Sequence, residues 1–106
     1  MGDAPEKPDP TGFISLSKKL IGEKLGESNI PIAYVGDTIA DISTVINARK
    51  EIPSQKFISI GIAPPHLHLN CLLKERYSYE INLRNAGADL ILNSIYDLTD
   101  INLDLF

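Results

Sequence analysis

An apolar run ends abruptly in two aspartates in the stretch IPIAYVGDTIADIS, residues 30 to 43. Asp37 follows the run directly after a glycine, and Asp41 comes four residues later, where a helical pattern begins. In open α/β sheets, ligands gather outside the carboxyl ends of the strands. A carboxylate there is well placed to hold Mg²⁺, which takes oxygen ligands and commonly uses one or two protein carboxylates. The stretch therefore predicts a metal site at Asp37, with Asp41 able to point back toward the same rim.

A purely structural interpretation of this stretch stays open beside the chemical one. Thr38 and Asp41 have the spacing of a capping box, in which the threonine hydroxyl accepts the amide of the later residue. The acidic side chain is also favoured by the positive end of the helix dipole. On this account Asp37 belongs to a turn and Asp41 to a cap, although Asp41 can serve both roles.

The elements that must position these carboxylates alternate between strands and helices. The apolar run without alternation is typical of a strand covered on both faces. Asp9 suits an N-cap and Pro10 a first helical position. We predict strands at residues 30–35, 56–61 and 89–92, helices at about 10–25, from Thr38, and at about 76–86, and a short helical turn around residues 95–98.

This alternation predicts βαβ crossovers and an α/β fold with a parallel sheet. Three parallel strands make a small sheet, which normally carries helices on both faces and further strands. We therefore expect about half of a larger three-layer, Rossmann-like domain. The helix at 10–25 carries an apolar stripe that includes Phe13, Leu16 and Leu20.

Composition excludes several classes of protein. The chain has 106 residues, of which 43% are hydrophobic and 23% charged, which is ordinary globular usage. The formal net charge is −4 and the ten Lys and Arg residues are scattered, so no nucleic-acid surface is expected. Cys71 is the single cysteine, and no apolar stretch is long enough for a membrane span or a signal peptide. We expect a cytoplasmic protein with no membrane partner.

A second group of polar residues follows the second predicted strand. His66, His68 and Cys71 offer three zinc-type ligands, but their spacing matches no standard structural zinc site. An irregular loop with partly exposed histidines is the favoured interpretation. The segment 63–66 lies at the same carboxyl edge as Asp37 and could instead wall a substrate pocket, whereas Tyr77 and Tyr79 are expected to pack the following helix.

Three segments in a fixed order carry a family resemblance. AYVGDTIADISTVINAR (33–49) has an apolar strand, Gly-Asp and a second aspartate four positions later, and EKPDPTGFISLSKKL (6–20) has a lysine, Pro-x-Pro and a helix. GADLILNSIYDL (87–98) is a closing strand and turn. Together they resemble the fourth motif, the third motif and the end of the core domain in the haloacid dehalogenase-like (HAD) hydrolase superfamily, specifically its phosphoglycolate-phosphatase-like members.

The resemblance implies roles for three residues. Lys7 becomes the cation that neutralises the nucleophilic aspartate and the bound phosphoryl group. Asp37 becomes the Mg²⁺ ligand, directly or through water, and Asp41 a ligand or an outer carboxylate at the same ion. A lysine and a divalent cation would stabilise the charge that phosphoryl transfer concentrates. Residues 1–9 would form an extended lead-in with Lys7, and 10–106 the carboxyl-terminal half of the domain.

The chain also departs from the family pattern. Members form a phosphoaspartate in an Asp-x-Asp motif and hold the phosphate with a Ser or Thr after the second strand, and neither feature occurs here. Asp104, in the closest local string, is expected to be a solvated tail residue. We therefore expect part of a Mg²⁺-dependent phosphatase for a small phosphorylated metabolite, inactive alone because covalent catalysis needs the missing carboxylate. The alternative is a non-catalytic α/β module that binds a partner or self-associates through an open sheet edge, whereas pairing with an amino-terminal half is expected of the enzyme.

Overall fold

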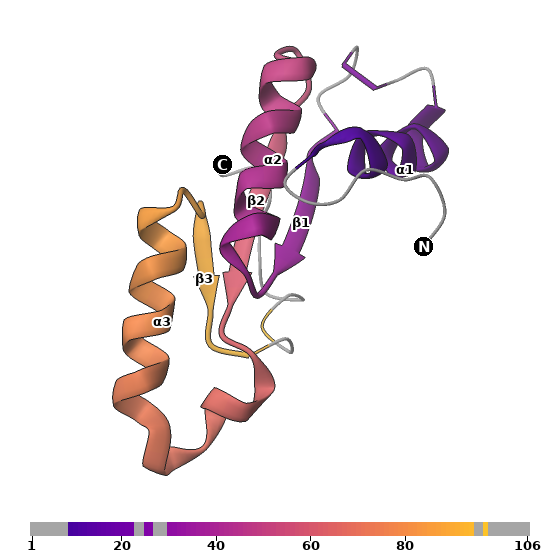
Figure 1. Ribbon diagram of the computed structural model, residues 1–106. Coiled ribbons are helices and arrows are strands. Elements are labelled where there is room, and N and C mark those ends of the chain that lie inside the picture. Colours follow the sequence, from indigo (N-terminus) through magenta and orange to yellow (C-terminus); the bar gives the residue numbers. More distant parts are fainter. Residues whose placement is uncertain (1–8, 23–24, 27–29, 95–96, 98–106) are drawn as a thin grey trace.

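The computed structural model describes residues 9–22, 25–26, 30–94 and 97, and these contain a three-stranded parallel sheet (Figure 1). The strands are β1 (Ile32–Gly36), β2 (Phe57–Ile62) and β3 (Leu90–Leu92), in the order β1-β2-β3. Each strand lies within two residues of its predicted position. The predicted α/β fold, a parallel sheet flanked by helices, is confirmed.

Three α-helices accompany the sheet in the described chain: α1 (Thr11–Ile21), α2 (Ile39–Glu51) and α3 (Leu73–Asn85). The predicted helix at 10–25 ends early because Gly22 takes a φ of 59°, outside the helical region. Pro10, predicted as the first helical residue, is instead the N-cap of α1, although the Asp9 side chain still accepts the amide of Thr11 at 2.8 Å. Of the turn expected at 95–98, only Asp97 falls within the described residues.

All of these helices pack on one face of the sheet. The chain moves from β1 to β2 and from β2 to β3 in the same direction across the sheet. Right-handed crossovers therefore place α2 and α3 on the same face, and Figure 1 shows α2 in front of β2. The Phe13 ring of α1 lies 5.1 Å from Tyr34 and 5.2 Å from Phe57, measured between ring centroids. The sheet and this helical layer account for two layers of the predicted three-layer arrangement, and the third stays a prediction.

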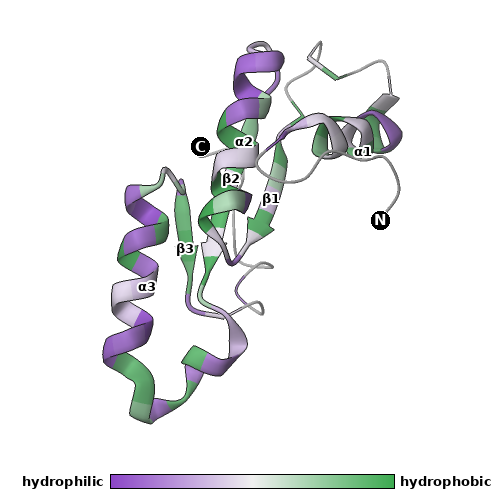
Figure 2. Cartoon of the chain, viewed as in Figure 1, coloured by the Kyte–Doolittle hydropathy of each residue, from purple (hydrophilic) through white to green (hydrophobic). Residues whose placement is uncertain are grey.

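The opposite face of the sheet is also apolar. Ile58, Ile60 and Leu92 are buried there, and Figure 2 shows β3 in green and β1 in green with paler segments. Strands without polar alternation are expected where both faces of a sheet are covered. The pattern that identified the strands in the sequence therefore agrees with burial on both faces.

The amino ends of the strands are tied together by a polar cluster. The Arg49 guanidinium at the end of α2 donates to the Phe57 carbonyl at 2.9 Å and forms an ion pair with Asp89. The Asp89 carboxylate also accepts the amide of Ser59 at 2.8 Å. These contacts join α2, β2 and the start of β3 at the edge opposite to Asp37.

Candidate functional site

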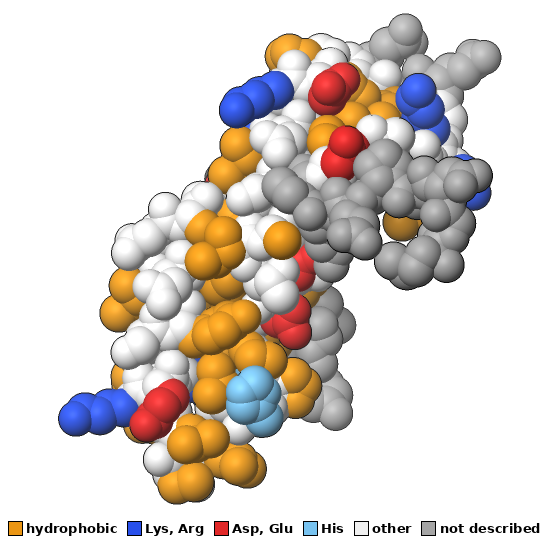
Figure 3. All heavy atoms as spheres, viewed as in Figure 1, with side chains coloured by type: hydrophobic (Ala, Val, Ile, Leu, Met, Phe, Trp, Pro, Cys, Tyr) orange, Lys and Arg blue, Asp and Glu red, His pale blue; other side chains and the backbone are white. Residues whose placement is uncertain are grey.

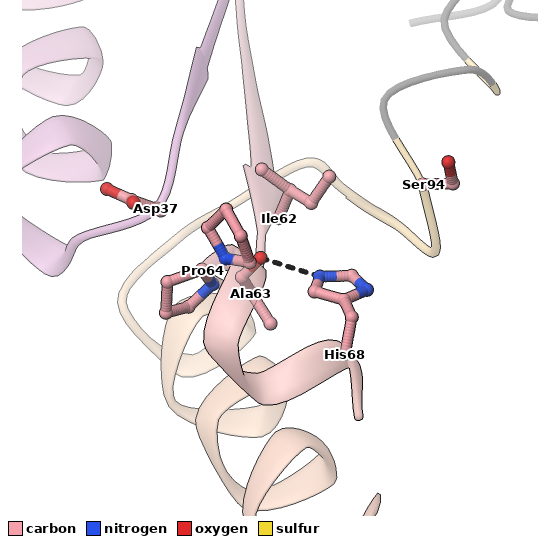
Figure 4. Close-up of a pocket in the computed structure, with 7 residues that line it drawn as sticks. Asp37, Ile62, Ala63, Pro64, His68 and Ser94 are labelled. Carbon is pink, nitrogen blue, oxygen red and sulfur yellow. Dashed lines mark hydrogen bonds between the residues drawn. The ribbon is translucent and has the colours of Figure 1, made fainter. Parts of the chain in front are cut away.

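The carboxyl edge of the sheet carries a cleft of about 430 Å³. Because parallel strands end at the same edge, the loops after β1, β2 and β3 meet there. Asp37 comes directly after β1, and Figure 4 shows it across the end of β2 from His68 and Ser94. The sequence placed Asp37 and the segment 63–66 at one edge, and the structure confirms this placement. Residues lining the cleft are Asp37, Ile62, Ala63, Pro64, Pro65, His68 and Ser94.

The second aspartate of the pair is buried in the turn that carries the first. Asp41 is only 3% exposed. Its Oδ2 atom accepts the amide of Asp37 at 3.1 Å and the amide of Thr38 at 3.2 Å. The Thr38 hydroxyl donates to the same oxygen at 2.9 Å and accepts the amide of Asp41 at 3.1 Å. The predicted capping box is therefore present.

The other carboxylate oxygen of Asp41 is engaged as well. Oδ1 accepts the hydroxyl of Tyr34, a residue of β1, at 3.0 Å. A metal ion that bound this carboxylate directly would compete with the donors that organise the turn. The structure thus shows the structural role of Asp41, while its role as a metal ligand stays a prediction.

Gly36 is required by this arrangement of the turn. A Cβ atom on Gly36 would lie 2.3 Å from Cβ and 2.7 Å from Oδ2 of Asp41. Side-chain atoms do not approach that closely, so no larger residue fits without moving Asp41. The Gly-Asp pair of the sequence therefore has a physical cause: the glycine makes room for the carboxylate that holds the next residue.

Helix α3 contributes a contact that the sequence did not reveal. The Tyr79 hydroxyl donates to the backbone carbonyl of Asp37, 42 positions away in the chain. Burial and the charges of Asp37 and Asp41 raise the pKa of Tyr79, which keeps the hydroxyl protonated as a donor. Tyr77 was expected to pack the helix as well, but that expectation is wrong, because Tyr77 is 56% exposed on another side of α3.

The two histidines differ in what they contact. The ring of His68 donates from Nε2 to the Ala63 carbonyl at 2.7 Å, since a carbonyl oxygen can only accept. This bond fixes the imidazole at the wall of the cleft (Figure 4), whereas His66 is exposed and does not line the cleft. Figure 3 shows hydrophobic side chains and a histidine gathered at the end of the molecule where the β2–α3 connection lies.

Ligands for a metal ion are sparse in the part of the chain that the structure describes. No group of three or more His, Cys, Asp or Glu side chains converges there, so the zinc alternative at His66, His68 and Cys71 gains no support. A Mg²⁺ ion at Asp37 would take most of its ligands from water and from phosphate oxygens, as this ion commonly does. Lys7 and Asp104 lie outside the described residues.

Comparison with known proteins gives no match to a family model, to a curated protein or to a solved structure. None of the helices in the described ranges is both long enough and apolar enough to cross a membrane. The resemblance to the HAD superfamily therefore rests on the three sequence motifs.

Proposed function

We propose that this chain is the carboxyl-terminal half of a cytoplasmic, Mg²⁺-dependent phosphatase of the HAD type that acts on a small phosphorylated metabolite. The observation that carries the proposal is the position of Asp37, which is the first residue beyond β1 and stands at the rim of the cleft. Ligands of open α/β sheets bind at this edge. The Gly-Asp-Thr sequence and the second aspartate provide the family resemblance at the same point.

The residues at the cleft suit a hard cation such as Mg²⁺. Asp37 offers a carboxylate that is partly exposed, and Mg²⁺ needs only one or two carboxylates together with water and phosphate oxygens. Asp41 keeps the Asp37 backbone in place through the hydrogen bond to its amide. When bound, the ion would supply positive charge against the phosphoryl oxygens.

The other walls of the cleft suit a small organic phosphate. Ile62, Ala63 and the two prolines provide apolar surface, while His68 and Ser94 provide polar groups. A volume of about 430 Å³ falls within the range of small-molecule sites, roughly 300 to 1,000 Å³. We assign to Lys7 the role of neutralising the phosphoryl group.

The nucleophile must come from outside these residues. No Asp-x-Asp occurs in the 106 residues, so the aspartate that attacks phosphorus would be on the amino-terminal half. The attack would break the bond from phosphorus to the ester oxygen and release the alcohol of the metabolite, and water would then hydrolyse the phosphoaspartate to regenerate the carboxylate and release phosphate. The chain by itself is accordingly expected to show no turnover.

A non-catalytic module that binds a partner is the second candidate function. Leu16 and Leu20, which belong to the apolar stripe of α1, are 55% and 70% exposed. Exposed leucines near each other on one helix favour contact with another polypeptide. A module of this kind would associate through α1 without contributing to a reaction.

The test is an assay of aryl phosphate hydrolysis by the chain alone and after addition of the polypeptide encoded directly upstream. We expect Mg²⁺-dependent activity only in the mixture, and its loss in Asp37→Ala. Light scattering on the same samples separates the two candidates. A stable, inactive complex would support the binding module and contradict the phosphatase.

A further inference from the structure

Two side chains on α3 hold the backbone on either side of the cleft. The Tyr79 hydroxyl donates to the Asp37 carbonyl, and the Arg76 guanidinium donates from Nη2 to the Asn93 carbonyl at 2.8 Å. Asp37 is the first residue beyond β1, and Asn93 is the first beyond β3. Residues three apart lie on the same side of a helix, so Arg76 and Tyr79 face the sheet together.

The Arg76 side chain is held in the orientation that this contact requires. Its Nε atom donates to Oε2 of Glu80 at 3.1 Å, one turn further along α3. The side chains of Arg76 and Glu80 are only 16% and 12% exposed. Charge-assisted hydrogen bonds of this kind are stronger than neutral ones, and little exposure means little screening by salt.

The helix that carries these donors is itself fixed to the middle of the sheet. Leu83 is 1% exposed, and its Cδ1 would lie 3.2 Å from a Cβ on Gly61 of β2. Gly61 thus allows α3 to pack closely against β2. Because α3 is anchored to the central strand, its bonds to Asp37 and Asn93 reach outward to the two flanking strands.

The contacts bear directly on the dimensions of the cleft. Asp37 and Ser94 line it on opposite sides, and Ser94 follows Asn93 immediately (Figure 4). Loops beyond strand ends lack the ladder bonds of the sheet and move more freely than the strands. A helix bonded to both loops restricts how far these walls can separate.

We propose that Tyr79 and Arg76 act as a brace: they are positioning residues that set the separation of the outer cleft walls and thereby the affinity for a phosphate-bearing ligand. The ligand class rests on the proposed function, whereas the mechanical role depends only on the two hydrogen bonds. The brace gives α3 a specific part in the site, although it supplies no group to the reaction.

The chain provides matched controls for both brace residues. Tyr77→Phe and Arg84→Gln change the same residue types on the same helix at exposed positions, and they are compared with Tyr79→Phe and Arg76→Gln. Arg76→Lys is a second variant that keeps the charge but lacks the fork that serves Glu80 and Asn93 together. Thermal unfolding confirms that each variant is folded.

The first measurement is the affinity of the full chain for inorganic phosphate in the presence of Mg²⁺. The amide NMR shifts of Thr38 and Ser94 report the binding. Loss of one hydrogen bond of about 0.5 to 1.5 kcal/mol predicts roughly 2- to 12-fold weaker binding in each brace variant. The controls should bind as tightly as the wild type. Equal affinities in brace and control variants would overturn the brace and leave the phosphatase proposal standing.

The second measurement is amide hydrogen exchange at Thr38 and Ser94, which needs no ligand. The brace predicts faster exchange at both positions in Tyr79→Phe or Arg76→Gln than in the controls, because the loops open more often. Unchanged exchange would overturn the mechanical role. Failure of the wild type, mixed with the polypeptide encoded directly upstream, to bind phosphate with Mg²⁺ would instead overturn the proposed function and the part of the brace that concerns affinity.

Discussion

The carboxylate of Asp41 accepts the backbone amide of Asp37 at 3.1 Å, so the second aspartate of the sequence holds the first in place. The two residues are chemically alike but differ in burial, since Asp41 is 3% exposed and Asp37 stands at the rim of the cleft. This difference separates a structural carboxylate from one that is free to meet a ligand. Substitution of Asp41 should therefore mainly lower the stability of the fold, whereas substitution of Asp37 should mainly affect ligand binding.

Asp41→Ala should lower the free energy of unfolding by about 2 to 4 kcal/mol, because it removes the cap and leaves the donors of the turn unsatisfied. Asp37→Ala should change it by less than about 0.5 kcal/mol, because the Asp37 side chain is partly exposed and caps no helix among the described residues. Urea denaturation of both variants measures the difference. Equal losses of stability would contradict the division of roles.

Gly36→Ala should destabilise the chain by about 2 to 4 kcal/mol, since the added methyl group collides with Asp41 and displaces the capping box. Gly12→Ala is the matched control. Gly12 lies in α1, and a Cβ at this position would meet nothing within 4 Å. Alanine is the better helix former, so this control should be neutral or should stabilise by up to about 1 kcal/mol. A tolerated Gly36→Ala would show that the close approach of Asp41 is not required.

The free energy of unfolding should fall at alkaline pH through Tyr79. The pKa of Tyr79 is raised above 10.0 by burial and by the charges of Asp37 and Asp41, so the folded chain keeps a proton that the unfolded chain loses. The contribution of Tyr79 to the free energy of unfolding is complete below pH 10, and it is lost as the pH rises through the raised pKa of the folded chain. Denaturation at a series of pH values should show a shallower decline for Tyr79→Phe than for the wild type, with Tyr77→Phe like the wild type. The same slope in all three proteins would contradict this assignment.

Local patterns in the sequence predicted the parts of the structure that depend on neighbours in the chain. The first strand was found because residues 30–35 form an apolar run without alternation, and the capping box was found because Thr38 and Asp41 have the right spacing. The end of α1 was misplaced because Gly22 and Gly26 both suit a helix terminus, and both take positive φ. Sequence alone does not decide which of two such glycines ends the helix.

Contacts between distant segments were beyond the reach of these patterns. The bond from Tyr79 to Asp37 joins residues 42 positions apart, and the bond from Arg76 to Asn93 joins residues 17 apart. Nothing in the local sequence distinguishes Tyr79 from the exposed Tyr77, because the direction of each side chain follows from how α3 packs on β2. For the same reason the sequence named the segment 63–66 as a wall but did not single out His68.

Binding of a hard divalent cation by Asp37 is the claim on which the proposed function depends, and Mn²⁺ titration of the full chain tests it most directly. Mn²⁺ accepts the same oxygen ligands as Mg²⁺, and its unpaired electrons broaden nearby amide NMR signals. Glu51→Gln serves as the control, since Glu51 is an exposed carboxylate at the far end of α2. We expect broadening centred on Asp37 and Thr38 that Mg²⁺ reverses, that Glu51→Gln retains and that Asp37→Asn abolishes. Broadening that persists in Asp37→Asn, or that centres elsewhere, would contradict this claim.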